Sequence, residues 1–198
     1  MPDIIVMDAS ASHNLNVLLE AHQQKALKDG RLKLVVSHHE KALAQAKKAG
    51  VYTLKFAEND SQADLAERLA TEHHAELIVV LDWPSPLDSA FLNRFPNKVI
   101  GIHPALSGQF PGKEAVRRAY EAYRNDEIKW SGCNLHYIMP DGQTGDIIRQ
   151  LVVPVEPKDT LERFQTRMRK SEAWILLKGV KQFLYELRAS KKRRSRNR

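Results

Sequence analysis

The sequence predicts an α/β protein built on a mostly parallel, Rossmann-like sheet with helices on both faces. Short runs of apolar, largely β-branched residues alternate with stretches whose apolar residues have helical spacing. The 198 residues suffice for one well-packed domain and are too few for two of ordinary size. An apolar content of 42% with 28% charged residues excludes a disordered chain. No apolar run is long enough for a transmembrane helix.

The first half of the chain contains the alternation itself. Its apolar runs predict strands buried on both faces at residues 4–7, 32–36, 51–54, 77–81 and 99–102. Helices are expected between them, at residues 15–27, 41–49 and 64–72. His13 or Asn14 is expected to cap the first helix, and Asp60 or Ser61 the third. This order predicts βαβ units and a parallel sheet.

After Gly112 the pattern changes. A helix is expected at residues 114–123, followed by strands at residues 134–139 and 147–153. The segment PDGQTGD between these strands has the residues of a hairpin or a longer loop, so antiparallel strands are expected here. A last helix is expected at residues 160–187, and residues 1–187 are expected to form one domain.

The net charge of +7 is concentrated in the last eleven residues, which contain seven bases and no acid. We expect residues 188–198 to be a disordered basic tail that binds the phosphates of RNA or DNA. The nucleic-acid contacts would come from Lys191, Lys192, Arg193, Arg194 and Arg196. The alternatives are a solubilising end, an anionic membrane surface as partner, and a nuclear localisation signal.

Cys133 is the single cysteine, which excludes an intramolecular disulfide and a cysteine metal cluster, and no metal site is expected. No basic segment followed by an apolar stretch opens the sequence, so no secretory signal is expected. These features favour an intracellular protein, in the cytoplasm or, given the tail, in the nucleus. The sequence does not indicate an oligomeric state.

Ligands of open α/β sheets bind beyond the carboxyl ends of the strands, and three such ends carry candidate residues. The first, at residues 8–14, has small and polar residues but no glycine, and is either a ligand loop or a turn capped by Ser12 or Asn14. The second carries Trp83, between the strand at residues 77–81 and two prolines, and this ring either lines a pocket or packs in the core. The third carries His103, which either acts as an acid, base or electrophile in catalysis or has a structural role.

The third strand end carries a family resemblance. The stretch VIGIHPALSGQFPGKEAVRRAYEA resembles the glycinamide ribonucleotide formyltransferases of purine synthesis, whose strand ends in Asn-x-His-Pro. The stretches SGCNLHYIMPDGQTGDIIRQLVVPV and DTLERFQTRMRKSEAWILL, and NLNVLLEA near the start, extend the resemblance over most of residues 3–187. It implies the formyltransferase fold. It also implies formyl transfer from 10-formyltetrahydrofolate to the amine of glycinamide ribonucleotide.

The resemblance assigns roles to particular positions, and the catalytic set is incomplete. The family's histidine is His103, but Gly101 stands at the asparagine position and Gln143 at the aspartate position, with Asp141 or Asp146 able to substitute after a loop shift. The implied substrate-binding residues are Ser10, Ser12, His13, Asn14, Gly112 and Glu172. The implied cofactor-binding residues are Trp83, Pro84, Ser85, Leu87, Met139 and Asp141.

We therefore expect a formyltransferase-like protein with a degenerate active site, weakly active or inactive. It would use 10-formyltetrahydrofolate if active and no cofactor otherwise. The alternative is a catalytically dead scaffold that binds RNA or a ribonucleoprotein through its tail. A third reading is a changed amine acceptor without a phosphate, such as an amino sugar.

Overall fold

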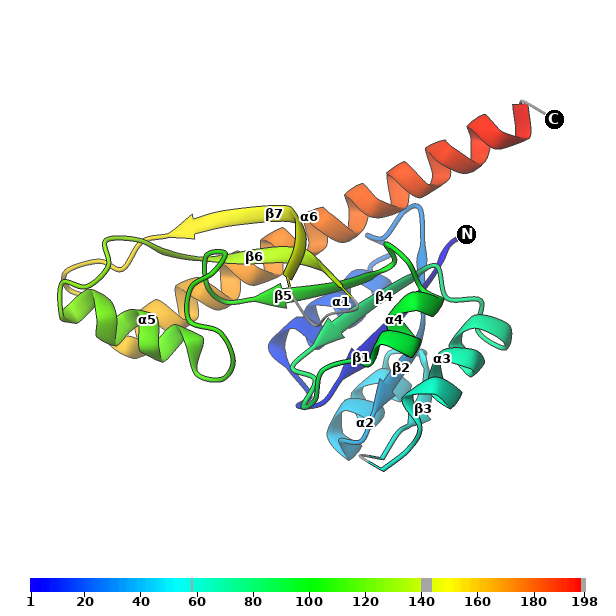
Figure 1. The fold of residues 1–198 in the computed structure, drawn as a ribbon, viewed down its shortest axis with the longest axis horizontal. Helices are drawn as coiled ribbons and strands as arrows, with labels where there is room; N and C mark the ends of the chain where they lie inside the picture. Colours follow the sequence, from blue (N-terminus) through cyan, green and yellow to red (C-terminus); the bar gives the residue numbers. More distant parts are fainter. Residues whose placement is uncertain (58, 140–143, 197–198) are drawn as a thin grey trace.

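The structure is a computed structural model that describes residues 1–57, 59–139 and 144–196. One seven-stranded sheet has the order β3-β2-β1-β4-β5-β6-β7 (Figure 1). The first five strands are parallel, β6 is antiparallel to β5, and β7 is antiparallel to β6. The strands are β1 (Asp3–Asp8), β2 (Arg31–Ser37), β3 (Tyr52–Lys55), β4 (Leu77–Leu81), β5 (Val99–His103), β6 (Ser131–Ile138) and β7 (Thr144–Val153). The predicted fold class is confirmed.

Six helices cover this sheet in the described part of the chain. They are α1 (His13–Gln23), α2 (Glu40–Lys48), α3 (Gln62–Thr71), α4 (Ser89–Arg94), α5 (Ala115–Arg124) and α6 (Leu161–Arg196). None of them combines the length and the apolar composition that crossing a bilayer requires.

Alternating residues of the central strands fill two separate cores. On β1, Ile4 and Val6 face a core completed by α1, α2, α5 and α6, whereas Ile5 and Met7 face a core completed by α3 and α4. All four side chains are fully buried, and each contributes about 1.5–3 kcal/mol to folding. Burial on both faces explains why these strands lack polar alternation.

Side-chain caps define where the helices begin. Ser12 caps α1 by accepting the Leu15 N–H at 3.0 Å, so the expected caps His13 and Asn14 instead lie in the first turn. Ser61 caps α3 as expected, accepting the Asp64 N–H at 3.1 Å. The short helix α4, capped by Asp88, was not predicted from the sequence.

Helix α6 corrects the expectation of a disordered tail, because it continues through residue 188 to Arg196 (Figure 1). Arg188 pairs with Asp29 and Lys191 with Glu76, which ties these turns to the body. Bases at a helix carboxyl end are also favoured by the helix dipole. Lys192 and Arg193 are exposed on this segment, while the side chains of Arg194 and Arg196 lie outside the described residues.

Candidate functional site

The strand order reverses between β1 and β4, and the carboxyl ends of β1, β4 and β5 lie side by side there. In open α/β sheets this reversal is where ligands bind, because the flanking connections diverge to opposite faces. The loops that follow these three strands, at residues 9–12, 82–88 and 104–112, therefore converge on one edge of the sheet.

A cavity of about 280 Å³ opens at this edge. It brings together four of the residues expected to bind substrate, namely Ser12, His13, Asn14 and Glu172. It is also lined by Asp82, Ile102, Pro104 and Arg169. The sequence analysis did not single out Asp82 or Arg169 as ligand-binding residues, although Asp82 directly follows an apolar strand.

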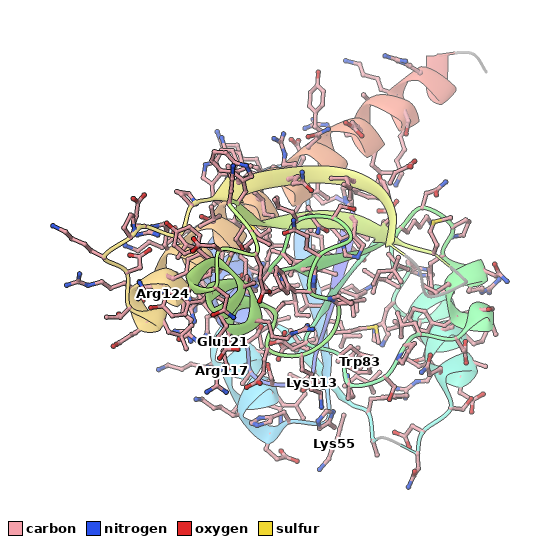
Figure 2. All side chains as sticks on the ribbon, turned by 60° about the vertical axis from the view of Figure 1, so that its left-hand side comes forward. Lys55, Trp83, Lys113, Arg117, Glu121 and Arg124 are labelled. Carbon is pink, nitrogen blue, oxygen red and sulfur yellow. The ribbon has the colours of Figure 1, made fainter. Side chains whose placement is uncertain are left out.

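A second cavity, of about 380 Å³, shares Pro104, Arg169 and Glu172 with the first, so the two adjoin. Its other walls come from the start of α5 and from α6, at Glu114, Ala115, Val116, Arg117, Leu161, Gln165 and Met168. Arg117 belongs to the exposed, charged side of α5, along which Glu121 and Arg124 also lie, and Lys113 precedes the helix (Figure 2). The two cavities thus lie along α6, the first between it and the first turn of α1 and the second between it and the start of α5.

Glu172 is the carboxyl group common to both cavities. The Asn14 amide donates a hydrogen bond to it at 3.2 Å. Burial, and to a lesser degree the charge of Asp82, raise the pKa of Glu172 to about 7. An ionised Glu172 can accept hydrogen bonds from ligand hydroxyl or amine groups.

Part of the first cavity suits an anion. The first turn of α1 contributes N–H groups that have no partner inside the helix, and the positive end of the helix dipole lies there. Arg169 adds a full positive charge to the same cavity. The cavity is thus polarised between cationic donors and the carboxylates of Glu172 and Asp82.

Asp8 shapes the loop after β1. Its buried carboxylate accepts the Ser10 N–H at 3.1 Å, the Ser12 N–H at 3.3 Å and the Ser12 hydroxyl. Burial raises the pKa of Asp8, and these hydrogen bonds oppose the rise. Ala11, within this loop, has φ +55°, a conformation that glycine adopts most readily. The Asp8 carboxylate thus stabilises a turn that contains no glycine.

Left-handed backbone recurs along this edge of the sheet. Asp82 has φ +46°, Phe110 has φ +45° and Glu114 has φ +56°. Such conformations cost roughly 1–3 kcal/mol each and persist only where the surrounding structure enforces them. The same conformation also occurs outside these loops, at Lys25, His74, Asn97 and Asp126, so it is not specific to this edge.

His103 lies next to the cavities without lining them. Its Nε2 donates to the carbonyl oxygens of Phe110 at 3.1 Å and Gln109 at 3.3 Å. Arg118 donates to the Phe110 carbonyl at 2.9 Å and also to that of Pro111, which fixes the loop above the histidine. In this arrangement the Nε2 proton is directed at the protein backbone.

At Gly101, two residues before His103, a side chain would meet close neighbours. A Cβ atom built there lies 3.1 Å from Ile138 Cδ1 and 3.6 Å from His136 Nε2. His136 is the cross-strand partner of Gly101, and its Nδ1 donates to Asn134 Oδ1 at 2.7 Å. Burial lowers the pKa of His136 to about 4, so this imidazole is neutral. Part of the space that a side chain at position 101 would need is therefore filled.

Sequence reasoning gave His136 no role. The signal available was its position in the stretch SGCNLHYI, where strand alternation and pairing place it beside Gly101.

Two of the other expected catalytic positions, Asp141 and Gln143, lie outside the described residues. Asp146 is exposed near the start of β7, and the described residues show no contact between it and His103. Gly112, expected to bind substrate, lines neither cavity. Ser10 donates to Asp82 at 2.8 Å and so lies at the rim of the first cavity.

The described residues that were expected to hold a folate line neither of the two cavities. Trp83 packs against Phe56 with ring centroids 5.8 Å apart, and Leu87 is buried in the α3–α4 core. Pro84 and Ser85 are exposed, Met139 is 39% exposed, and neither cavity is lined by any of these side chains. The core interpretation of Trp83 thus agrees with the packing.

Two other kinds of site, a nucleophilic cysteine and a metal centre, were also considered for the described residues. Burial raises the pKa of the Cys133 thiol to about 12, so it is not a nucleophile at neutral pH. No group of three or more histidine, cysteine, aspartate or glutamate side chains within the described ranges is arranged to hold a metal ion.

A model of the formyl transferase family matches residues 3–180. The chain belongs to this family. The phosphoribosylglycinamide formyltransferase of Dictyostelium discoideum is 30% identical over 199 residues, covering 90% of this chain and 96% of that protein. The corresponding protein of Haemophilus influenzae is 28% identical and covers 92% of this chain and 87% of its own length.

Solved structures of formyl transferases agree with this assignment. The glycinamide ribonucleotide transformylase 1 of Symbiobacterium toebii has a TM-score of 0.82 at 29% identity, covering 94% of this chain and 89% of that one. The phosphoribosylglycinamide formyltransferase of Streptococcus pneumoniae has a TM-score of 0.77 at 28% identity, covering 91% and 98%. The resemblance seen in the sequence is confirmed at the level of family and fold.

Proposed function

We propose that this formyl transferase binds an amine acceptor of the glycinamide ribonucleotide type in the two adjoining cavities, while its formyl-transfer chemistry is slow or absent. The observation that carries the second half of this proposal is the environment of Gly101. No side-chain amide is present there, and Ile138 and His136 take part of the space it would need.

Formyl transfer passes through a tetrahedral oxyanion, which needs hydrogen-bond donors directed at the developing charge. Loss of one such donor typically costs about 10²–10³ in rate. Here Gly101 supplies none, and the Nε2 proton of His103 is donated to backbone carbonyls. Both donors are thus missing from this geometry.

The cavities, in contrast, retain features that suit an acceptor. The amide groups at the start of α1 and Arg169 suit a phosphate, and Glu172 suits the hydroxyl groups of a ribose. The relatives that match along most of this chain act on phosphoribosylglycinamide, which supports this choice of ligand.

Calorimetric titration with glycinamide ribonucleotide tests the proposal for binding. We expect saturable heat that Arg169→Ala and Glu172→Ala both reduce at least tenfold in affinity, since charged hydrogen bonds contribute roughly 1.5–3 kcal/mol. Glu186→Ala, an exposed residue of α6 about four turns beyond Glu172, is the matched control. Absence of heat at about 1 mM ligand would contradict the proposal.

A second function is favoured by the exposed bases of the C-terminal turns of α6. We propose that residues 188–196 bind the phosphates of RNA or DNA, as a helix that projects beyond the sheet (Figure 1). Ending the chain at Leu187 should then weaken retention on nucleic acid at low salt. Equal retention by the shortened chain would exclude the tail as the binding element.

A further inference from the structure

The outward side of α6 carries a continuous basic and aromatic stripe. Its members recur at intervals of three or four residues, the spacing of one helix face. They are Lys170, Trp174, Lys178, Lys181, Tyr185, Arg188 and Lys192, all exposed and without an acid among them. From Lys170 to Lys192 the stripe is about 33 Å long.

The two aromatic rings of the stripe are unusual for a solvated helix face. Trp174 is 50% exposed and Tyr185 is 68% exposed, and neither ring lines the two cavities. Lys178 Nζ lies 5.8 Å from the centre of the Trp174 ring, so a base and a ring form one local unit. The opposite side of α6, including Phe164, Met168 and Ile175, is buried in the core.

We infer that this stripe is a binding surface for single-stranded nucleic acid. The cations of the stripe match the charge of a phosphate backbone, and flat exposed rings about three helical turns apart suit stacking with unpaired bases. A duplex offers the same phosphates but keeps its bases stacked on one another. The surface should therefore prefer single strands.

This inference deepens the second proposed function, since it places the contact surface on the body of α6 as well as on its last turns. The Arg188–Asp29 and Lys191–Glu76 ion pairs hold those turns in line with the stripe. Although Arg188 is paired with Asp29, 72% of its side chain is exposed, so it can still contact a phosphate of the nucleic acid.

Fluorescence anisotropy of the full chain with a labelled oligonucleotide of about 15 nucleotides tests the surface. We expect the single strand to bind at least tenfold more tightly than its duplex, and the Trp174→Ala/Tyr185→Ala variant to lose at least tenfold in affinity for the single strand. Lys178→Ala/Lys181→Ala should lower the salt slope by about 2. Tyr52→Ala, a 74% exposed ring on β3, is the matched control, and circular dichroism verifies folding of each variant.

The outcomes separate this inference from the tail proposal. The tail proposal stands and the stripe is overturned if three results occur together. Truncation at Leu187 abolishes binding, the Trp174→Ala/Tyr185→Ala variant binds the single strand as tightly as the wild type does, and the wild type binds the duplex as tightly as the single strand. Absence of binding to either nucleic acid at low salt overturns both. Binding to phosphatidylserine vesicles without binding to the oligonucleotide also overturns both, because the partner is then a membrane surface.

Discussion

Asp8 has a role that glycine residues usually have in loops of this kind. Its carboxylate accepts backbone N–H groups of Ser10 and Ser12 and so holds Ala11 in a left-handed conformation. The loop therefore depends on one buried charge rather than on backbone freedom. An inspection of the sequence for glycine alone misses this solution.

Asp8→Ala should destabilise the fold, because it leaves the Ser12 hydroxyl and two N–H groups without an acceptor. We expect the free energy of unfolding to fall by about 2–4 kcal/mol, measured by urea denaturation. Asp8→Asn keeps one acceptor oxygen and should lose less. Asp29→Ala, which breaks a surface ion pair, should cost less than about 1 kcal/mol, and an equal loss in both alanine variants would contradict this account.

Glu172 should make stability depend on pH. Its pKa is about 7 in the folded chain against an ordinary 4.5, so the folded state binds the proton more tightly. The free energy of unfolding should therefore fall, by up to about 3 kcal/mol, as pH rises from about 4.5 to 7, and level off above. Glu172→Gln should remove this part of the pH dependence, and Glu186→Gln should not. A profile unchanged by Glu172→Gln would refute the assignment.

Restoring an asparagine at Gly101 should fail by itself. The new Cβ would lie 3.1 Å from Ile138 Cδ1, so Gly101→Asn should lower the free energy of unfolding by about 1–3 kcal/mol. Ile138→Val deletes that methyl group and should recover part of the loss in a double-mutant cycle. Additive effects of the two substitutions would show that Ile138 does not fill the space. Addition of Gln143→Asp then tests whether activity returns.

At the scale of elements, strands were easier to predict than helix ends. Strands such as 77–81 were placed correctly because burial on both faces leaves an unbroken apolar run. The end of α6 was misplaced because charge composition alone resembles disorder, whereas Asp29 and Glu76, distant in sequence, tether it. Helix α4 is six residues long, which is too short for periodicity to reveal.

Truncation at Leu187 should have little effect on stability. It removes two exposed ion pairs, each contributing roughly 0.2–1 kcal/mol, and no buried apolar side chain. We expect the melting temperature to fall by only a few degrees, with a matching small loss of helical circular dichroism. A collapse of the melting transition would mean that these turns are part of the cooperative core.

At the scale of the whole molecule, the cavity proposed for the acceptor was more predictable than the proposed catalytic centre. Ser12, His13, Asn14 and Glu172 were predicted together and line one cavity, since strand ends and the last helix meet where the sheet order reverses. The direction of the His103 proton and the filling of the space at Gly101 depend on cross-strand neighbours. Such packing is not visible in a linear pattern.

The most direct test of binding without effective turnover is the release of tetrahydrofolate when the full chain is mixed with 10-formyltetrahydrofolate and saturating glycinamide ribonucleotide. The account predicts a rate that is indistinguishable from that of His103→Ala and far below ordinary enzymatic turnover of about 1–10³ s⁻¹. Turnover within that range, lost on His103→Ala, would contradict it and show that this catalytic centre works despite Gly101.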